Sequence, residues 1–102
     1  MQYTLNDQDF ERLSAIFKLF GSAPRLKILL CLHGGEQGVR ALQRASGLTQ
    51  SATSHQLRDL KAGRIIRSRK AGQQVFYALD DSHIFSLLES GIEHVKGAHC
   101  YE

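Results

Sequence analysis

The chain has 102 residues and a formal net charge of +3, enough for one domain with one modest core but not for two. Its longest uninterrupted apolar run, residues 28–32, is far too short to span a membrane, so no membrane partner is expected. Residues 1–4 carry neither a basic region nor an apolar signal core, which favours a cytoplasmic protein. A domain this short leaves about a third of its unfolded surface exposed, so a homodimer would add core.

Positive charge is concentrated in the middle of the chain. Residues 58–70 carry six basic side chains against one acid, whereas residues 71–102 carry one lysine against five acids. A local basic block predicts an anionic partner such as the phosphate backbone of a nucleic acid. A solvated surface without a partner would show the same count.

The hydrophobic pattern predicts four helices, a β-hairpin and a last helix in chain order. Asn6 or Asp7 can cap the first helix, and Pro24 suits the first turn of the second. We expect helices over about 7–20, 24–32, 39–46, 50–62 and 81–96, and strands over 65–69 and 73–79 joined by a turn at 70–72.

A helix-turn-helix followed at once by a basic hairpin is the layout of a winged helix. The predicted fold is therefore a single winged helix-turn-helix domain over residues 1–102, mainly α with a small β-hairpin. Its helix-turn-helix covers 39–62, its wing 64–79, and its last helix 81–96 is a candidate dimer interface.

The fourth helix has one face that suits DNA. At 100° per residue, an arc of about 140° collects short polar and basic side chains. These are Gln50, Ser51, Ser54, His55, Arg58 and Lys61. Such a face fits the major groove, where Gln pairs with adenine and Arg with guanine. An ordinary amphipathic surface helix is the alternative, and the adjoining turn and basic hairpin disfavour it.

The hairpin supplies further basic residues for a double-stranded DNA partner. Arg67, Arg69 and Lys70 surround its tip together with Gln73 and Gln74. We expect contacts with the flanking backbone or the minor groove, which supply salt-dependent affinity more than sequence preference.

Two histidines lie on one face of the last predicted helix. His83 and His94 are separated by about 16 Å along the helix axis, so they cannot share an ion within one chain. An antiparallel partner helix would place His94 of one chain beside His83 of the other, with Asp81 directed to the same point. The helix offers an apolar seam for such a partner: Ile84, Leu87, Leu88, Gly91, Ile92 and Val95. From the residues alone, two exposed histidines with no metal role fit equally well.

Three stretches carry a resemblance to a known family. Residues 48–61, the wing segment 72–79 and the following residues 80–84 resemble the ArsR/SmtB family of metal-sensing repressors over roughly residues 10–96. The resemblance implies a homodimeric winged helix that represses its operator and is released when a metal binds. It also implies base and backbone contacts by Gln50, Ser51, Ser54 and His55.

The zinc-sensing branch of this family has an Asp-x-His pair from one chain and a His-x-x-His or His-x-x-Glu pair from the other. Asp81 and His83 resemble the first pair and His94 begins the second, but the fourth position falls on Gly97. His99 or Cys100 could substitute, or water could fill the position. Zinc is therefore the expected effector, with nickel or cobalt as alternatives because added tail ligands suit an expanded geometry. The family's Cys-x-Cys site is absent from residues 36–40, which disfavours arsenic, cadmium or lead sensing at that position.

Two other readings stay open. A regulator of the same fold could sense oxidants or sulfur species through Cys31 and Cys100, or it could bind DNA without any effector. Two cysteines do not make a disulfide framework and fit a reducing compartment. An enzyme is not expected, because the sequence has no HExxH, P-loop, glycine-rich nucleotide motif or nucleophile elbow.

Overall fold

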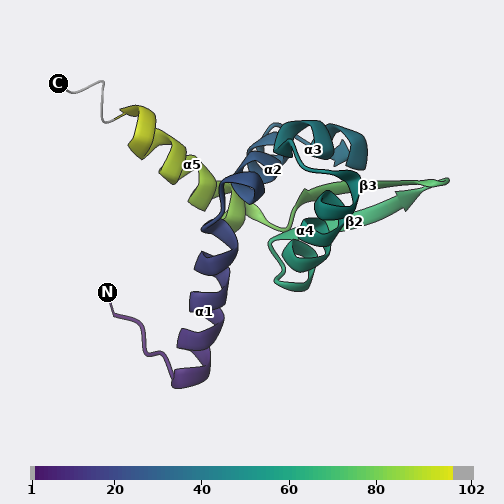
Figure 1. The fold of residues 1–102 in the computed structure, drawn as a ribbon. Coiled ribbons are helices and arrows are strands. Elements are labelled where there is room, and N and C mark those ends of the chain that lie inside the picture. Colours follow the sequence, from purple (N-terminus) through teal and green to yellow (C-terminus); the bar gives the residue numbers. More distant parts are fainter. Residues whose placement is uncertain (1, 98–102) are drawn as a thin grey trace.

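The computed structural model describes residues 2–97 and confirms the winged helix-turn-helix fold, with five helices and a small antiparallel sheet (Figure 1). In chain order the elements are α1 (Asp7–Phe20), α2 (Ala23–His33), β1 (Gln37–Gly38), α3 (Val39–Ser46), α4 (Gln50–Ala62), β2 (Ile66–Ala71), β3 (Gln74–Leu79) and α5 (Ser82–Gly97). His99 and Cys100 lie outside the described residues.

The sheet differs from the predicted hairpin in two ways. It has three strands in the order β1-β3-β2, because Gln37 and Gly38 pair with Tyr77 and Phe76 of β3. Sequence analysis missed β1 because two residues are too few to show alternation. The predicted turn at 70–72 was also wrong by two residues. Gly72, at φ +65°, makes the turn, so β2 extends to Ala71 and pairs there with Gln74.

The core lies where α2, α3, α4, the sheet and the first half of α5 meet. Ten buried aliphatic side chains form it: Ile28, Leu29, Leu32, Leu42, Leu57, Leu60, Ile65, Ile66, Ile84 and Leu88. Thr53, Leu57 and Leu60 of α4 are buried together on the side of this helix that faces away from its predicted DNA-reading face. α1 contributes no buried residue and only partly buried contacts to this core.

The two terminal helices project from this body as separate arms (Figure 1). The radius of gyration is 15.0 Å, larger than the roughly 13 Å typical of a compact chain of this length. Among residues 2–97, no helix has the length and apolar character needed to cross a membrane. The arms therefore leave apolar helix surface exposed.

A buried hydroxyl pair fixes the turn between α3 and α4. Ser46 Oγ accepts the N–H of Leu48 at 3.1 Å and donates to the carbonyl oxygen of Gln43 at 3.0 Å. It also lies 3.3 Å from Oγ1 of the fully buried Thr53 on α4. Gly47 completes the turn in the left-handed region at φ +73°. One serine therefore sets how the two helices meet.

Replacing Ser46 with alanine should lower the free energy of unfolding by about 1–3 kcal/mol, because the buried Thr53 hydroxyl and the Leu48 N–H lose their partner. Urea unfolding followed by circular dichroism measures the change. Ser51→Ala is the matched control, since Ser51 is exposed on the opposite side of α4 and should stay within about 0.5 kcal/mol of the wild type. Equal effects of the two substitutions would contradict this role of the hydroxyl pair.

Candidate nucleic-acid interface and metal-binding residues

The predicted DNA-reading face of α4 is exposed along its whole length. All six residues of this face are exposed: Gln50, Ser51, Ser54, His55, Arg58 and Lys61. Thr49 caps the helix by accepting the N–H of Ala52 at 3.1 Å, so the first turn is ordered where it would meet DNA. His55 Nδ1 and the Arg58 guanidinium share a hydrogen bond along this face. The helix thus presents both amide and guanidinium donors to a groove.

A contact that sequence analysis missed anchors the side of α4. Arg25, near the start of α2, donates through Nε to Oε1 of Gln56 at 2.6 Å and through NH1 to the carbonyl oxygen of Lys18 at 3.2 Å. One guanidinium therefore joins the last turn of α1 and the first turn of α2 to the recognition helix. Sequence analysis gave no means of finding it, because Arg25 and Gln56 are 31 positions apart.

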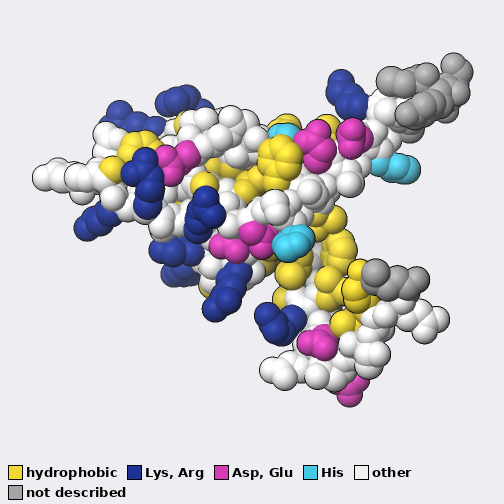
Figure 2. Space-filling view, turned by 180° about the vertical axis from the view of Figure 1, so that it is seen from behind, with side chains coloured by type: hydrophobic (Ala, Val, Ile, Leu, Met, Phe, Trp, Pro, Cys, Tyr) yellow, Lys and Arg dark blue, Asp and Glu magenta, His cyan; other side chains and the backbone are white. Residues whose placement is uncertain are grey.

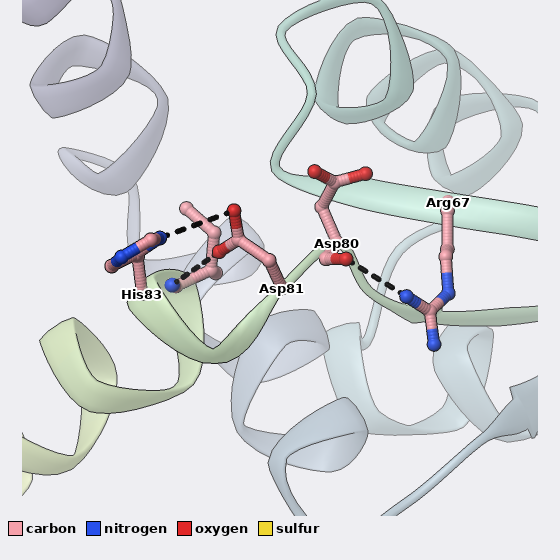
Figure 3. A network of polar contacts seen from close by, with 5 residues as sticks. Arg67, Asp80, Asp81 and His83 are labelled. Carbon is pink, nitrogen blue, oxygen red and sulfur yellow. Dashed lines mark hydrogen bonds and ion pairs between the residues drawn. The ribbon is translucent and has the colours of Figure 1, made fainter.

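The three predicted wing residues have different surroundings. Arg67 lies near the base of the hairpin and donates to the backbone carbonyl of Asp80 at 2.9 Å (Figure 3). Arg69 is engaged by two hydrogen bonds to Glu36, each 2.8 Å long. Lys70 is exposed and lies opposite Val75, close to the turn at the tip. Only Lys70 of the three therefore lies at the tip as predicted.

Asp81 and His83 form a pair at the start of α5. His83 Nδ1 lies 3.4 Å from Oδ2 of Asp81, and their side chains are 91% and 48% exposed (Figure 3). The other Asp81 oxygen accepts the N–H of Ile84 at 3.0 Å and so caps the helix. This bond, followed by the contact with His83, holds the pKa of Asp81 below its ordinary value. The carboxylate is thus ionised, near an imidazole and accessible to a cation.

The Asp81–His83 pair adjoins the end of the recognition helix. A groove of about 730 Å³ is bounded by α1, the residues that end α4 and the start of α5. Its walls include Arg12, Ala62, Gly63, Asp81 and His83. An ion bound here would lie between the two arms and the DNA-reading unit.

His94 does not join this pair within one chain, and His99 lies outside the described residues. His94 is exposed in the last turns of α5, eleven residues beyond His83, and Gly97 ends the helix. No group of three or more His, Cys, Asp or Glu side chains within residues 2–97 is arranged to hold a metal. The Asp and His donor types suit zinc, nickel or cobalt, and within residues 2–97 one protomer brings Asp81 and His83 together without a third such ligand.

An apolar groove separates the two arms on the side away from the wing. It has a volume of about 480 Å³, and its wall is almost wholly apolar. Its lining residues come from α1, α2 and α5, and include Phe17, Phe20, Leu26, Leu30, Leu87 and Val95. Figure 2 shows hydrophobic side chains along the α1 arm, while Lys and Arg gather on the helix-turn-helix and wing. Sequence analysis predicted most of the α5 side of this surface and missed the contribution of α1. It was wrong for Ile84, which is buried in the core of its own chain and does not line the groove.

A histidine at the end of α2 joins α5 to the body. His33, at the end of α2, stacks on Phe85 with ring centroids 4.1 Å apart, and its Nε2 lies 2.6 Å from Oε2 of Glu89. Cys31, two residues earlier, is half-buried and packs against the hydrophobic core. His33 thus fixes the start of the α5 arm on α2.

The arrangement of these elements defines a winged helix-turn-helix DNA-binding regulator. The model of a family described as "Bacterial regulatory protein, arsR family" matches residues 23–68. The HTH-type transcriptional regulator NmtR of Mycobacterium tuberculosis is 34% identical over 95 residues, which cover 93% of this chain and 79% of NmtR. The chain therefore belongs to the ArsR family, whose members regulate transcription and are not enzymes.

Two other relatives and one solved structure agree with this family assignment. The transcriptional repressor SmtB homologue of Synechocystis is 30% identical over 84% of this chain, which spans 65% of that protein. A cadmium resistance regulatory protein, the CadC homologue of Staphylococcus aureus, is 33% identical over 82% of this chain and 70% of its own length. The solution structure of apo-NmtR superposes with a TM-score of 0.75 at 32% identity, over 95% of this chain and 82% of that one.

One relative is named an activator, whereas the SmtB homologue is named a repressor. HlyU of Vibrio cholerae, named a transcriptional activator, is 33% identical over 83% of this chain and 82% of HlyU. Its structure has a TM-score of 0.78 at 27% identity, and covers 88% of this chain and 97% of HlyU. Family membership thus shows DNA-binding transcriptional regulation and does not by itself distinguish repression from activation.

Proposed function

We propose that the protein is a cytoplasmic, homodimeric repressor that binds operator DNA without metal and is released when a transition metal binds. The observation that carries the proposal is the exposed Asp81–His83 pair in a groove that also contains the end of α4. An ion that draws a third ligand to this point changes the surroundings of the recognition helix. The names of the SmtB and CadC homologues, a repressor and a cadmium resistance regulator, favour metal-responsive repression.

The proposed dimer is formed by the two arms. Phe10, Leu13 and Phe17 of α1 are 56%, 42% and 55% exposed, and Val95 of α5 is 68% exposed. A run of exposed apolar side chains this long is uncommon on a monomer and is typical of an interface. A second copy, packed on the groove between α1 and α5 by two-fold symmetry, would cover it.

The dimer would complete two equivalent metal sites. We place Asp81 and His83 of one protomer in each site with the partner's His94, because the two histidines of one α5 are too far apart to share an ion. His99 remains a candidate fourth ligand and lies outside the described residues. Zinc would be held by these nitrogen and oxygen donors. Nickel or cobalt would need further ligands to complete a larger coordination sphere.

The proposed DNA contacts come from two elements of each protomer. Gln50, Ser51 and Ser54 at the start of α4, with His55 and Arg58 on the same face, would enter the major groove. Lys70 at the wing tip and Arg67 at the wing base would meet flanking phosphates. Arg69 is held by Glu36 through two hydrogen bonds and is not included among these phosphate contacts.

A titration at one salt concentration tests the proposal. The wild-type protein first selects a duplex from a randomised library, and its affinity is then measured with chelator and with zinc, nickel or cobalt. We expect one of these metals to lower the affinity by about 5-fold to 150-fold, the usual range for coupling between two sites. If no metal changes the affinity, metal sensing is excluded. A change in affinity caused by an oxidant, lost in Cys31→Ala and Cys100→Ala but kept in His94→Ala, would instead favour the cysteine sensor.

A further inference from the structure

Three side chains form a contact that crosses the wing sheet. Arg69 on β2 pairs in register with Phe76 on β3, and Phe76 pairs in turn with Gly38 on β1. The Arg69 guanidinium lies over the Phe76 ring, 5.1 Å from its centroid, and reaches Glu36 just before β1. The outer strand β2 is thereby tied to the opposite edge of the sheet.

The pair has the geometry that only arginine can make. Nε of Arg69 donates to Oε2 of Glu36, and NH2 donates to Oε1, each at 2.8 Å. Two parallel bonds from a planar fork to one carboxylate are stronger and more directional than a single exposed ion pair. The same bonds lower the pKa of Glu36, so its carboxylate is ionised at neutral pH. The contact with Phe76 further restricts the guanidinium.

The contact also reaches the helix-turn-helix. β1 leads directly into α3, because Gly38 is both the last residue of β1 and the N-cap residue of that helix. Glu36 therefore lies only three residues before Val39, the first residue of α3. Any movement of β2 relative to β1 would change the position of the wing relative to the DNA-reading unit.

We propose that Glu36, Arg69 and Phe76 form a clamp that fixes the wing relative to α3, and that Arg69 is a positioning residue and not a phosphate contact. The inference rests on DNA binding by α4 and is independent of any metal response. Lys70 provides the contrast. Side chains of adjacent strand residues point to opposite faces, so Lys70 lies outside the clamp while Arg69 lies within it.

The decisive variants separate shape from charge. Arg69→Lys keeps the positive charge but loses the bidentate fork, whereas Glu36→Gln keeps the arginine and removes its anchor. In a salt series on the duplex selected by the wild-type protein, we expect Arg69→Lys, Arg69→Gln and Glu36→Gln each to weaken binding about threefold to tenfold, the cost of ordering a released side chain and strand. The Glu36→Gln/Arg69→Gln double variant should be no weaker than either single variant.

The salt dependence and the matched control identify the role. The slope of log affinity against log salt should stay at the wild-type value in the clamp variants, and Lys70→Gln should reduce it by about 0.9 through loss of one phosphate contact. The positioning role of Arg69 is overturned if Arg69→Lys binds like the wild type while Arg69→Gln lowers the slope. It is also overturned if Glu36→Gln binds DNA more tightly than the wild type.

A second measurement needs no DNA. Amide hydrogen exchange in β2 and β3 should be faster in Arg69→Lys and Glu36→Gln than in Lys70→Gln, because only the clamp variants release the wing. Equal exchange in all three variants would overturn the clamp. Failure of the wild type to select any duplex, with this exchange difference intact, would overturn DNA reading by α4 and leave the clamp as a feature of the fold.

Discussion

Replacing His94 with alanine is expected to abolish the metal-induced release from DNA while metal-free binding stays unchanged. His94 is exposed in the last turns of α5, outside both the core and the DNA-reading face, so its loss removes a ligand and little else. The wild type should lose affinity by about 5-fold to 150-fold with metal, and the variant should lose none. Affinity for the selected duplex is measured with chelator and with saturating zinc at one salt concentration.

Mixing two inactive variants tests whether the ligands come from different protomers. His83→Ala and His94→Ala homodimers should both fail to respond. In a heterodimer of the two, one site loses both histidines, while the other keeps Asp81 and His83 on one chain and the partner's His94. Random subunit exchange should make about half of the dimers such heterodimers, and these should recover metal binding at one site.

A site contained within one chain would give the opposite result, because every chain in the mixture then carries a broken site. Isothermal titration of the mixture with zinc distinguishes the two cases. Ser90→Ala is the control for a substitution on α5, since Ser90 is exposed on this helix and is not one of the proposed ligands. A full response to metal in His94→Ala would remove His94 from the site.

Phe17→Glu is expected to convert the dimer to a monomer and to weaken DNA binding by at least about a hundredfold. Phe17 is 55% exposed on α1 and lines the apolar groove between the arms, so a charge there would be buried unpaired in the dimer. A monomer engages one half-site alone and loses the gain from linking two contacts. Sedimentation equilibrium and binding to the selected duplex measure the two effects.

Gln8→Glu is the matched control, because it adds the same charge to the same helix. Nine residues separate positions 8 and 17, so at 100° per residue the two lie on opposite faces of α1. The control should remain dimeric and bind DNA like the wild type. Helical content should be unchanged in Gln8→Glu and should fall in Phe17→Glu, because α1 contributes nothing buried to the core of its own chain and is ordered by the proposed partner. A dimeric Phe17→Glu variant would place the interface elsewhere.

Local signals predicted most of the fold. Asn6 forms the predicted cap of α1 together with Asp9, and Pro24 lies in the first turn of α2 as its fixed φ requires. α4 begins and ends where Thr49 and Gly63 indicate. These features depend on residues a few positions apart, so the sequence carries them directly. The strand β1 was missed because its two residues are defined only by pairing with β3.

Contacts between distant residues were beyond sequence analysis. Helical periodicity predicted the polar face of α4. The hydrogen bonds from Arg69 to Glu36, by contrast, join positions 33 residues apart, and no periodicity links them. Spacing predicts that Arg69 is basic and near the wing, and it cannot predict which acid is its partner. Likewise, Phe10, Leu13 and Phe17 have helical spacing that fits burial in a core, and only the fold shows that they are exposed.

The absence of buried residues in α1 has a consequence for how this protein responds to dilution. A helix that has little to pack against in its own chain would gain its ordering free energy from association, so folding of α1 and formation of the proposed dimer would be thermodynamically linked. The melting temperature should then rise with protein concentration by mass action. A cell that makes few copies would hold a pool of less stable monomers, which proteases could cleave at α1. The lifetime of the protein would then depend on its own concentration.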